Sequence, residues 1–125
     1  VVVGSNNIPQ LEGVPVRAEI EALLQTPVIL ENDANAAALG ESWMGAGQGV
    51  ADQILITLGT GIGGGIISGG RVLHGYRGMA GEIGHMTVVP NGNPCACGNS
   101  GCLEKHASAT AIKSTALLMG LPVTE

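Results

Sequence analysis

The N-terminal third of the chain alternates between apolar runs and polar breaks, which predicts a short series of elements. Residues 1–3 (VVV) fit the end of a strand, and residues 27–31 (PVILE) fit a second strand. Between them, a proline suited to a first helical turn precedes apolar residues at helical spacing, so we predict a helix over residues 14–25. A second helix is predicted over residues 34–44, where the small residues of ANAAALG permit close packing against a neighbouring element.

The middle of the chain predicts a β-meander. Residues 53–58 (QILITL) have a strong strand pattern, and the glycine-rich stretch 59–65 (GTGIGGG) predicts the turn that follows. Residues 66–67 continue a second strand, and a Ser-Gly-Gly turn leads into a third strand over residues 71–74. A final helix is predicted over residues 108–119, because glycine and then proline follow its last residue.

Composition narrows the classes of protein to which the chain can belong. It has 125 residues, 45% of them hydrophobic, which is enough for a core. Its formal net charge is −5 with only five Lys and Arg residues, which argues against a nucleic-acid-binding face on this piece. No apolar run is long enough to span a membrane and none has the form of a signal peptide. Because the chain begins inside an apolar run, we expect it to be a piece of a larger protein.

All three cysteines lie in one segment rich in glycine and asparagine, as Cys95, Cys97 and Cys102. These residue types tolerate the positive-φ turns that gather three thiolates around one point. Three sulfurs need a fourth ligand to complete a tetrahedral zinc site, and His85 is the best-placed candidate. The alternative is three structural or incidental cysteines, although a disulfide would leave one thiol over and the C-x-C spacing disfavours an internal bridge. A site with no open position is structural, and free thiols suit a reducing cytoplasm.

The glycine turn offers a second candidate site. Gly59, Gly61 and Gly64 match the G-x-G-x-x-G pattern of dinucleotide-binding proteins. That fingerprint requires a helix directly after the turn, whereas a strand pattern follows here, so we reject the interpretation. Successive N–H groups of a glycine-rich turn can still converge on a phosphate, and Thr60 adds a hydroxyl donor. An ordinary hairpin, whose glycines only turn the chain, is an equally good interpretation.

Asp33 follows a predicted strand and begins a predicted helix, a junction at which the binding sites of α/β folds cluster. A carboxylate there can act as the base that accepts the proton of a hydroxyl nucleophile, as in phosphoryl transfer. The alternative is that Asn32 or Asp33 only caps the helix. Asp33 and the glycine turn together suggest phosphoryl transfer, whereas neither does so alone.

Four motifs cover nearly the whole chain in a fixed order: ENDANAAALGE (Glu31–Glu41), LGTGIGGGI (Leu58–Ile66), GEIGH (Gly81–His85) and CACGNSGCLE (Cys95–Glu104). Together they resemble the ROK family of sugar kinases and sugar-responsive repressors, with the likeness strongest to its bacterial glucokinases. The resemblance implies an α/β, actin-like ATPase fold, present here in part, with a zinc-bound loop. Residues 1–37 would belong to the first, smaller domain and residues 38–125 to the second, larger one, with the active cleft between the domains.

The resemblance also implies partners and cofactors. A hexose and ATP would be the substrates, with Mg²⁺ accompanying ATP and Zn²⁺ held for a structural purpose. Phosphorylation of glucose to glucose 6-phosphate is the implied reaction, in a cytoplasmic homo-oligomer, a dimer or a tetramer. No membrane and, for this piece, no nucleic acid would be involved.

Individual roles follow from the same resemblance. Asp33 matches the base that faces the terminal hydroxyl of the sugar, and it would bind the sugar together with Asn32, Glu82, His85 and Glu104. Carboxylates suit this task because they accept hydrogen bonds from vicinal hydroxyls in fixed geometry. The implied phosphate-binding residues of the hairpin are Gly59, Thr60, Gly61, Gly63 and Gly64. The implied zinc ligands are His85, Cys95, Cys97 and Cys102.

Parts of the family pattern are missing, and two classes of function stay open. The N-terminal aspartate–glycine phosphate loop and the C-terminal part, which contribute to nucleotide and magnesium binding in the family, are not in this chain, so we expect the piece alone to be inactive. The alternative to a kinase is the sugar-sensing part of a ROK repressor, although Gly59-Thr60-Gly61 is kinase-like. A zinc-dependent interaction domain is a third reading. Among kinases, N-acetylmannosamine and other hexoses remain alternatives, and Glu82 favours glucose.

Overall fold

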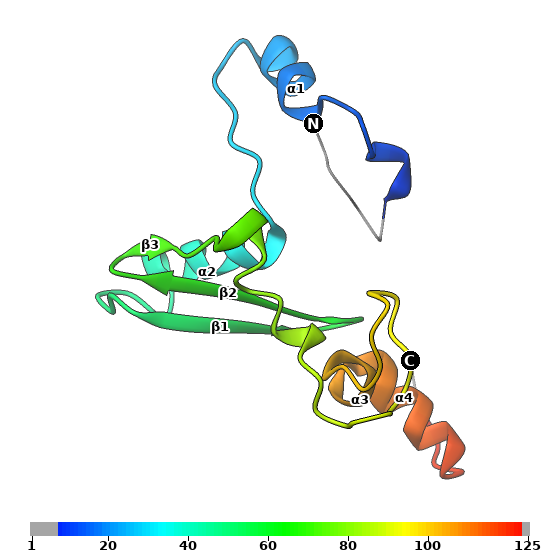
Figure 1. Cartoon of the computed structure of the whole chain (residues 1–125). Helices are drawn as coiled ribbons and strands as arrows, with labels where there is room; N and C mark the ends of the chain where they lie inside the picture. The colour runs from blue at the N-terminus through cyan, green and yellow to red at the C-terminus, as the bar shows by residue number, and fades with distance from the viewer. Residues whose placement is uncertain (1–7, 124–125) are drawn as a thin grey trace. The chain divides into compact units, whose positions relative to one another are not determined.

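The computed structural model describes residues 8–123 of the chain, and these fall into two compact units (Figure 1). The first unit ends at residue 31 and the second begins at residue 32. The strand predicted over residues 1–3 lies outside the described residues. The assignment of residues 1–37 and 38–125 to two domains of a larger protein stays a prediction.

The predicted helix in the first unit is confirmed as α1, Val16–Leu24. It ends at Gln25, whose φ of 52° places the residue in the left-handed region and whose N–H donates to the Glu21 carbonyl. The Glu21 carboxylate accepts hydrogen bonds from the Val28 N–H and from Arg17 Nε, both at 3.0 Å. These bonds, that of Val28 first, hold the pKa of Glu21 below its ordinary value.

The strand predicted over residues 27–31 is wrong. These residues have no regular secondary structure, and no strand pairs with them in the described part of the chain. Ile29 is 86% exposed and Leu30 is 48% exposed. An apolar run predicts that a segment can form a strand, but only a partner strand supplies the ladder of hydrogen bonds.

The second unit is built on a three-stranded antiparallel meander, β1 (Gln53–Leu58), β2 (Ile62–Ser68) and β3 (Arg71–Val72), in that spatial order. The meander and the bounds of β1 are confirmed. The predicted turn over residues 59–65 is too long, because β1 and β2 stay paired from Gln53↔Ile67 to Leu58↔Ile62. Only residues 59–61 turn the chain, and the next glycines are strand residues.

Glycines in β2 allow helix α2, Asp33–Met44, to approach the sheet closely (Figure 1). A Cβ atom at Gly65 would lie 2.6 Å from both the Ala34 carbonyl oxygen and Ala38 Cβ, and one at Gly63 would lie 3.2 Å from Ala34 Cβ. Non-bonded atoms do not approach to 2.6 Å, so position 65 has no room for a side chain. The prediction that small residues in this helix pack closely against a neighbour is confirmed.

Residues 81–84 pack just as closely against β2. A Cβ atom at Gly64 would lie 2.6 Å from the Gly81 carbonyl oxygen and 2.7 Å from Ile83 Cδ1. One at Gly84 would collide with the carbonyl oxygen of Ile62. This contact carries the 3₁₀ turn η3, Ile83–His85, onto the strand.

Two helices complete the second unit, α3 (Glu104–Ala107) and α4 (Ala109–Leu118). The predicted C-terminal helix is confirmed. Ser108 caps α4 by accepting a hydrogen bond from the Ala111 N–H at 3.1 Å, and Gly120 follows it with φ 71°. In residues 8–123, no helix combines the length and the apolar composition that a membrane crossing needs.

The glycine contacts predict that substitution by alanine lowers the unfolding free energy at one position and raises it at another. Gly65→Ala should lower the unfolding free energy by about 1–3 kcal/mol, because the new methyl group meets backbone and Ala38 rather than a mobile side chain. Gly40→Ala is the matched control, since Gly40 lies inside α2 with nothing within 4 Å of its added Cβ. That variant should gain about 0.5–1 kcal/mol through helix propensity.

Urea denaturation of the full-length protein measures both variants. Equal shifts in the same direction would contradict the close approach of α2 to β2.

Candidate functional site

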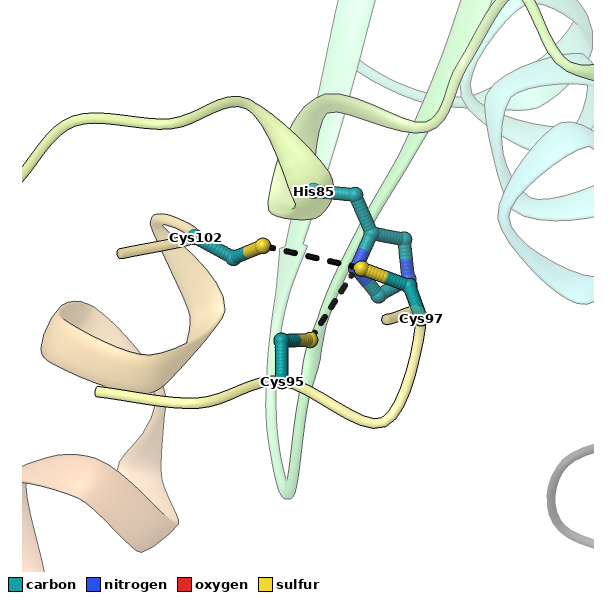
Figure 2. Close-up of side chains that lie close together, drawn as sticks. All are labelled: His85, Cys95, Cys97 and Cys102. Atoms are coloured by element: carbon teal, nitrogen blue, oxygen red, sulfur yellow. Dashed lines mark hydrogen bonds between the residues drawn. The ribbon is translucent and has the colours of Figure 1, made fainter. Parts of the chain in front are cut away.

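The structure brings together the four predicted metal ligands (Figure 2). The ligand atoms of His85, Cys95, Cys97 and Cys102 all lie within 4.8 Å of one another. Cys95 Sγ lies 3.5 Å from His85 Nδ1, and Cys97 Sγ lies 3.7 Å from Cys102 Sγ. The last distance is far longer than the roughly 2.05 Å of a disulfide bond, and all three thiols are free.

Local backbone geometry explains how this loop folds around one point. The Cys95 N–H donates to the Asn99 carbonyl at 2.9 Å, which closes the turn that carries Cys97. Gly98 and Gly101 have φ angles of 91° and 74°, so the expectation of positive-φ turns is met by glycine at two of the positions that need it. An isolated bridge between Thr87 and Cys102 then fixes the third cysteine beside the segment that carries His85.

The arrangement fits a tetrahedral metal ion. With Zn–S bonds of about 2.3 Å and Zn–N bonds of about 2.0–2.1 Å, tetrahedral angles place two sulfurs about 3.8 Å apart and a sulfur and a nitrogen about 3.6 Å apart. The observed separations of 3.7 Å and 3.5 Å match both values. The donor set of three thiols and one imidazole is also one that zinc prefers.

Protons compete with a metal for the buried thiol. Cys102 is 0% exposed, and burial raises the pKa of its thiol to about 12. A hydrogen bond from the Asn99 backbone, and then one from Cys95, lowers the pKa of the exposed Cys97 thiol. A cation that binds here must therefore displace the proton of Cys102, whereas Cys97 gives up its proton more readily.

His85 links the cysteine cluster to a carboxylate. Its Nδ1 faces Cys95, and its Nε2 lies 3.7 Å from Glu82 Oε2. A metal on Nδ1 leaves the proton on Nε2, which then points toward the side of Glu82. The structure thus joins His85 and Glu82, two of the residues predicted to bind sugar.

The predicted capping residue and the predicted base are separate residues. Asn32 is the N-cap of α2, because its Oδ1 accepts hydrogen bonds from Ala34 N–H at 2.9 Å and Asn35 N–H at 3.1 Å. Asp33 is the first residue of the helix and is exposed, and its Oδ1 also accepts a hydrogen bond from the Ala34 N–H at 2.9 Å. Asn32 is therefore the N-cap with two acceptor bonds, and Asp33 shares the first of the two N–H donors.

Glu104 contacts the glycine hairpin rather than the His85–Glu82 pair. Its Oε2 accepts a hydrogen bond from the Ile62 N–H at 3.1 Å, and its Oε1 lies 3.4 Å from Lys105 Nζ. A Cβ atom at Gly61 would meet the Glu104 carboxylate, so a side chain there would have to displace the end of the Glu104 side chain. The structure thus couples a predicted sugar ligand to the predicted phosphate turn.

The predicted phosphate-binding residues divide between turn and strand. Gly59, Thr60 and Gly61 form the tip of the β1–β2 hairpin, whereas Gly63 and Gly64 lie within β2. The Gly63 N–H donates to Thr57 Oγ1 at 3.1 Å.

Sequence reasoning missed two contacts of the tip. The Ala109 N–H donates to the Gly59 carbonyl and Thr110 Oγ1 donates to the Thr60 carbonyl, each at 2.9 Å. The start of the helix was predictable from Ser108, but its position beside a turn about fifty residues earlier was not.

Comparisons with known proteins agree with this geometry. The ROK family model matches residues 1–119. The glucokinase of Halalkalibacterium halodurans is 60% identical over 99 residues, which cover 78% of this chain and 30% of that protein. The ROK hexokinase of Thermus thermophilus superimposes with a TM-score of 0.84 at 46% identity, covering 98% of this chain and 41% of that structure. A Streptomyces griseus ROK glucokinase, solved with glucose and AMPPNP, has a TM-score of 0.75 at 48% identity, covering 87% and 36%.

Relatives at lower identity include proteins named as a repressor and as a kinase of another sugar. A xylose repressor of Caldicellulosiruptor bescii is 43% identical over 103 residues (82% of this chain, 26% of that protein), and an N-acetylmannosamine kinase of Escherichia coli is 41% identical over 111 (89% and 38%). The chain spans about a third of the length of the glucokinases that it matches. Its α/β fold is that of the corresponding part of the ROK sugar kinases. With a family match over nearly its whole length, the chain belongs to the ROK family.

Proposed function

We propose that the protein carrying this chain is a glucokinase, which transfers the terminal phosphoryl group of ATP to glucose and yields glucose 6-phosphate. Support comes from relatives named glucokinase at 50–60% identity and from the solved glucokinase that holds glucose and AMPPNP. Mg²⁺ accompanies ATP in this proposal. Three free thiols in a metal loop suit the reducing cytoplasm in which such a protein would work.

One observation carries the proposal: α2 lies along β2 with its N-terminal end toward the hairpin tip (Figure 1). Ala34, near the start of the helix, packs against Gly63, and Ala38 packs further along the strand at Gly65. Asp33 therefore lies in the same compact unit as the turn at residues 59–61. Phosphoryl transfer needs this combination, because the base that takes the hydroxyl proton and the amides that bind phosphate must keep a fixed separation.

The sugar-binding half of the proposal rests on polar groups at three places. His85 and Glu82 are paired across 3.7 Å, and Glu104 lies at the hairpin. Carboxylates accept hydrogen bonds from neighbouring hydroxyls, and an imidazole with fixed tautomer donates one. Asn32 and Asp33 would meet the sugar from the start of α2.

Zinc in this proposal shapes the loop and takes no part in the chemistry. His85, Cys95, Cys97 and Cys102 would hold it, and the ion leaves no ligand position open for a substrate. It would supply a fixed ring orientation for His85 and a closed loop before Glu104.

Two alternative hypotheses, a repressor and an N-acetylmannosamine kinase, predict behaviour of the full-length protein that differs from that of a glucokinase. A coupled assay with ATP and either glucose or N-acetylmannosamine tests all three. We expect turnover with glucose at a kcat/KM at least tenfold above that with N-acetylmannosamine. Sugar binding by calorimetry without any turnover would instead support a sensor, and a preference for N-acetylmannosamine would replace the substrate.

Asp33→Asn should lower kcat by about two to four orders of magnitude while leaving the fold and most sugar binding intact. The physical reason is that an amide cannot accept the hydroxyl proton, whereas the cap of α2 comes from Asn32 and survives. Asp52→Asn is the matched control, because Asp52 binds Ser68 Oγ and the Gly69 N–H in a surface turn. Steady-state kinetics of both variants check the prediction, and near wild-type turnover of Asp33→Asn would show that the residue is no base.

Protein purified without added metal should contain one zinc ion per chain by elemental analysis. Cys102→Ser should remove most of it and lower the melting temperature, because metal binding contributes to the free energy of folding. Ser100→Ala, in the same loop but outside the ligand set, should keep the zinc. Metal-free protein with a disulfide between any two of the three cysteines would contradict the assignment.

A further inference from the structure

The tip of the β1–β2 hairpin is held from outside by the beginning of α4. The Ala109 N–H donates to the Gly59 carbonyl at 2.9 Å, and Thr110 Oγ1 donates to the Thr60 carbonyl at 2.9 Å. The two bonds fix consecutive peptide units, because the Gly59 carbonyl shares a plane with the Thr60 N–H and the Thr60 carbonyl shares one with the Gly61 N–H.

Peptide planarity turns these bonds into a statement about the amides. In a trans peptide unit the N–H points opposite to the C=O. With both carbonyls directed at α4, the N–H groups of Thr60 and Gly61 are directed away from it. Within residues 8–123, neither N–H donates to a protein acceptor, whereas the neighbouring N–H groups of Gly59 and Ile62 bind the Gly61 carbonyl and Glu104.

We propose that Ala109 and Thr110 are positioning residues for nucleotide binding: they hold the hairpin tip in the one peptide orientation that presents two N–H groups to a phosphate. This inference rests on the proposed kinase function and deepens it. Neither residue touches the nucleotide, because both act through the carbonyls of the turn.

The turn needs such a restraint because glycine lies on both sides of Thr60. Glycine adopts positive and negative φ with similar ease, so the two peptide units can rotate at small cost. A rotation of either unit would replace an N–H with a carbonyl oxygen, which repels phosphate. Glu104 fixes the end of the turn at Ile62 but leaves the two peptide units before Gly61 unrestrained.

Thr110→Val tests the side-chain bond in the full-length enzyme. The substitution keeps the shape of an exposed residue and removes only the donor hydroxyl. The ATP KM should rise about three- to tenfold, the equivalent of one lost hydrogen bond, while the glucose KM and the melting temperature stay unchanged. Thr110→Ser should restore the wild-type ATP KM, and Thr115→Val, an exposed threonine further along the same helix, should have no effect.

Ala109→Pro tests the backbone bond independently. Proline lacks the N–H but suits the first position of a helix, and the preceding Ser108 already has the extended backbone that proline requires, with φ −70° and ψ 161°. We expect the same selective rise in the ATP KM.

The outcomes separate this inference from the proposed function. A wild-type protein without hexose kinase activity overturns the proposed function and the positioning role with it. An active wild-type protein whose ATP KM is unchanged in both variants overturns the positioning role alone. Parallel rises in both KM values with a lower melting temperature would show a general structural effect and would also overturn it.

Discussion

Three consecutive glycines in β2, residues 63–65, let neighbouring segments pack directly on the strand. The arrangement of the rest of the second unit depends on this close packing. Gly63 and Gly65 admit α2, while Gly64 admits the backbone at Gly81 and Ile83. Each contact carries a candidate site residue with it. Asp33 precedes the alanine that packs on Gly63, and Glu82 and His85 flank Ile83. A side chain at any of these three glycines would push one of these groups away from the hairpin.

The sequence was informative where the signal is local. The bounds of β1, the helix beginning near Ala34, the helix capped by Ser108 and the cysteine cluster all follow from spacing, caps and turn residues, and the structure confirms them. The strand prediction for residues 27–31 failed because an apolar run cannot reveal whether a partner strand exists. The prediction that glycines 63–65 belong to the turn failed because glycine indicates a turn and a close backbone contact equally well. Only the packing of α2 distinguishes the two.

The cysteine cluster and the glycine turn at residues 59–61 lie far apart in the sequence, but they are connected in space. Only one residue separates Cys102 from Glu104, whose carboxylate accepts a hydrogen bond from the Ile62 N–H at the end of the turn. Four more residues lead to Ser108, where α4 begins and supplies the two bonds to Gly59 and Thr60. The segment from 102 to 110 therefore runs from the buried thiol to the hairpin tip.

These contacts add a second explanation for the glycines of the turn. A phosphate turn is usually explained by the space that glycine leaves for the ligand. Here Gly61 also leaves space for the Glu104 carboxylate, and the carbonyls of Gly59 and Thr60 are occupied by α4. The carbonyl oxygens of the tip, which would repel an anion, all accept hydrogen bonds from protein groups. The N–H groups of Thr60 and Gly61 face away from α4. In the proposed nucleotide-binding role, the preference of the turn for phosphate would follow from how its carbonyls are held as much as from the absence of side chains.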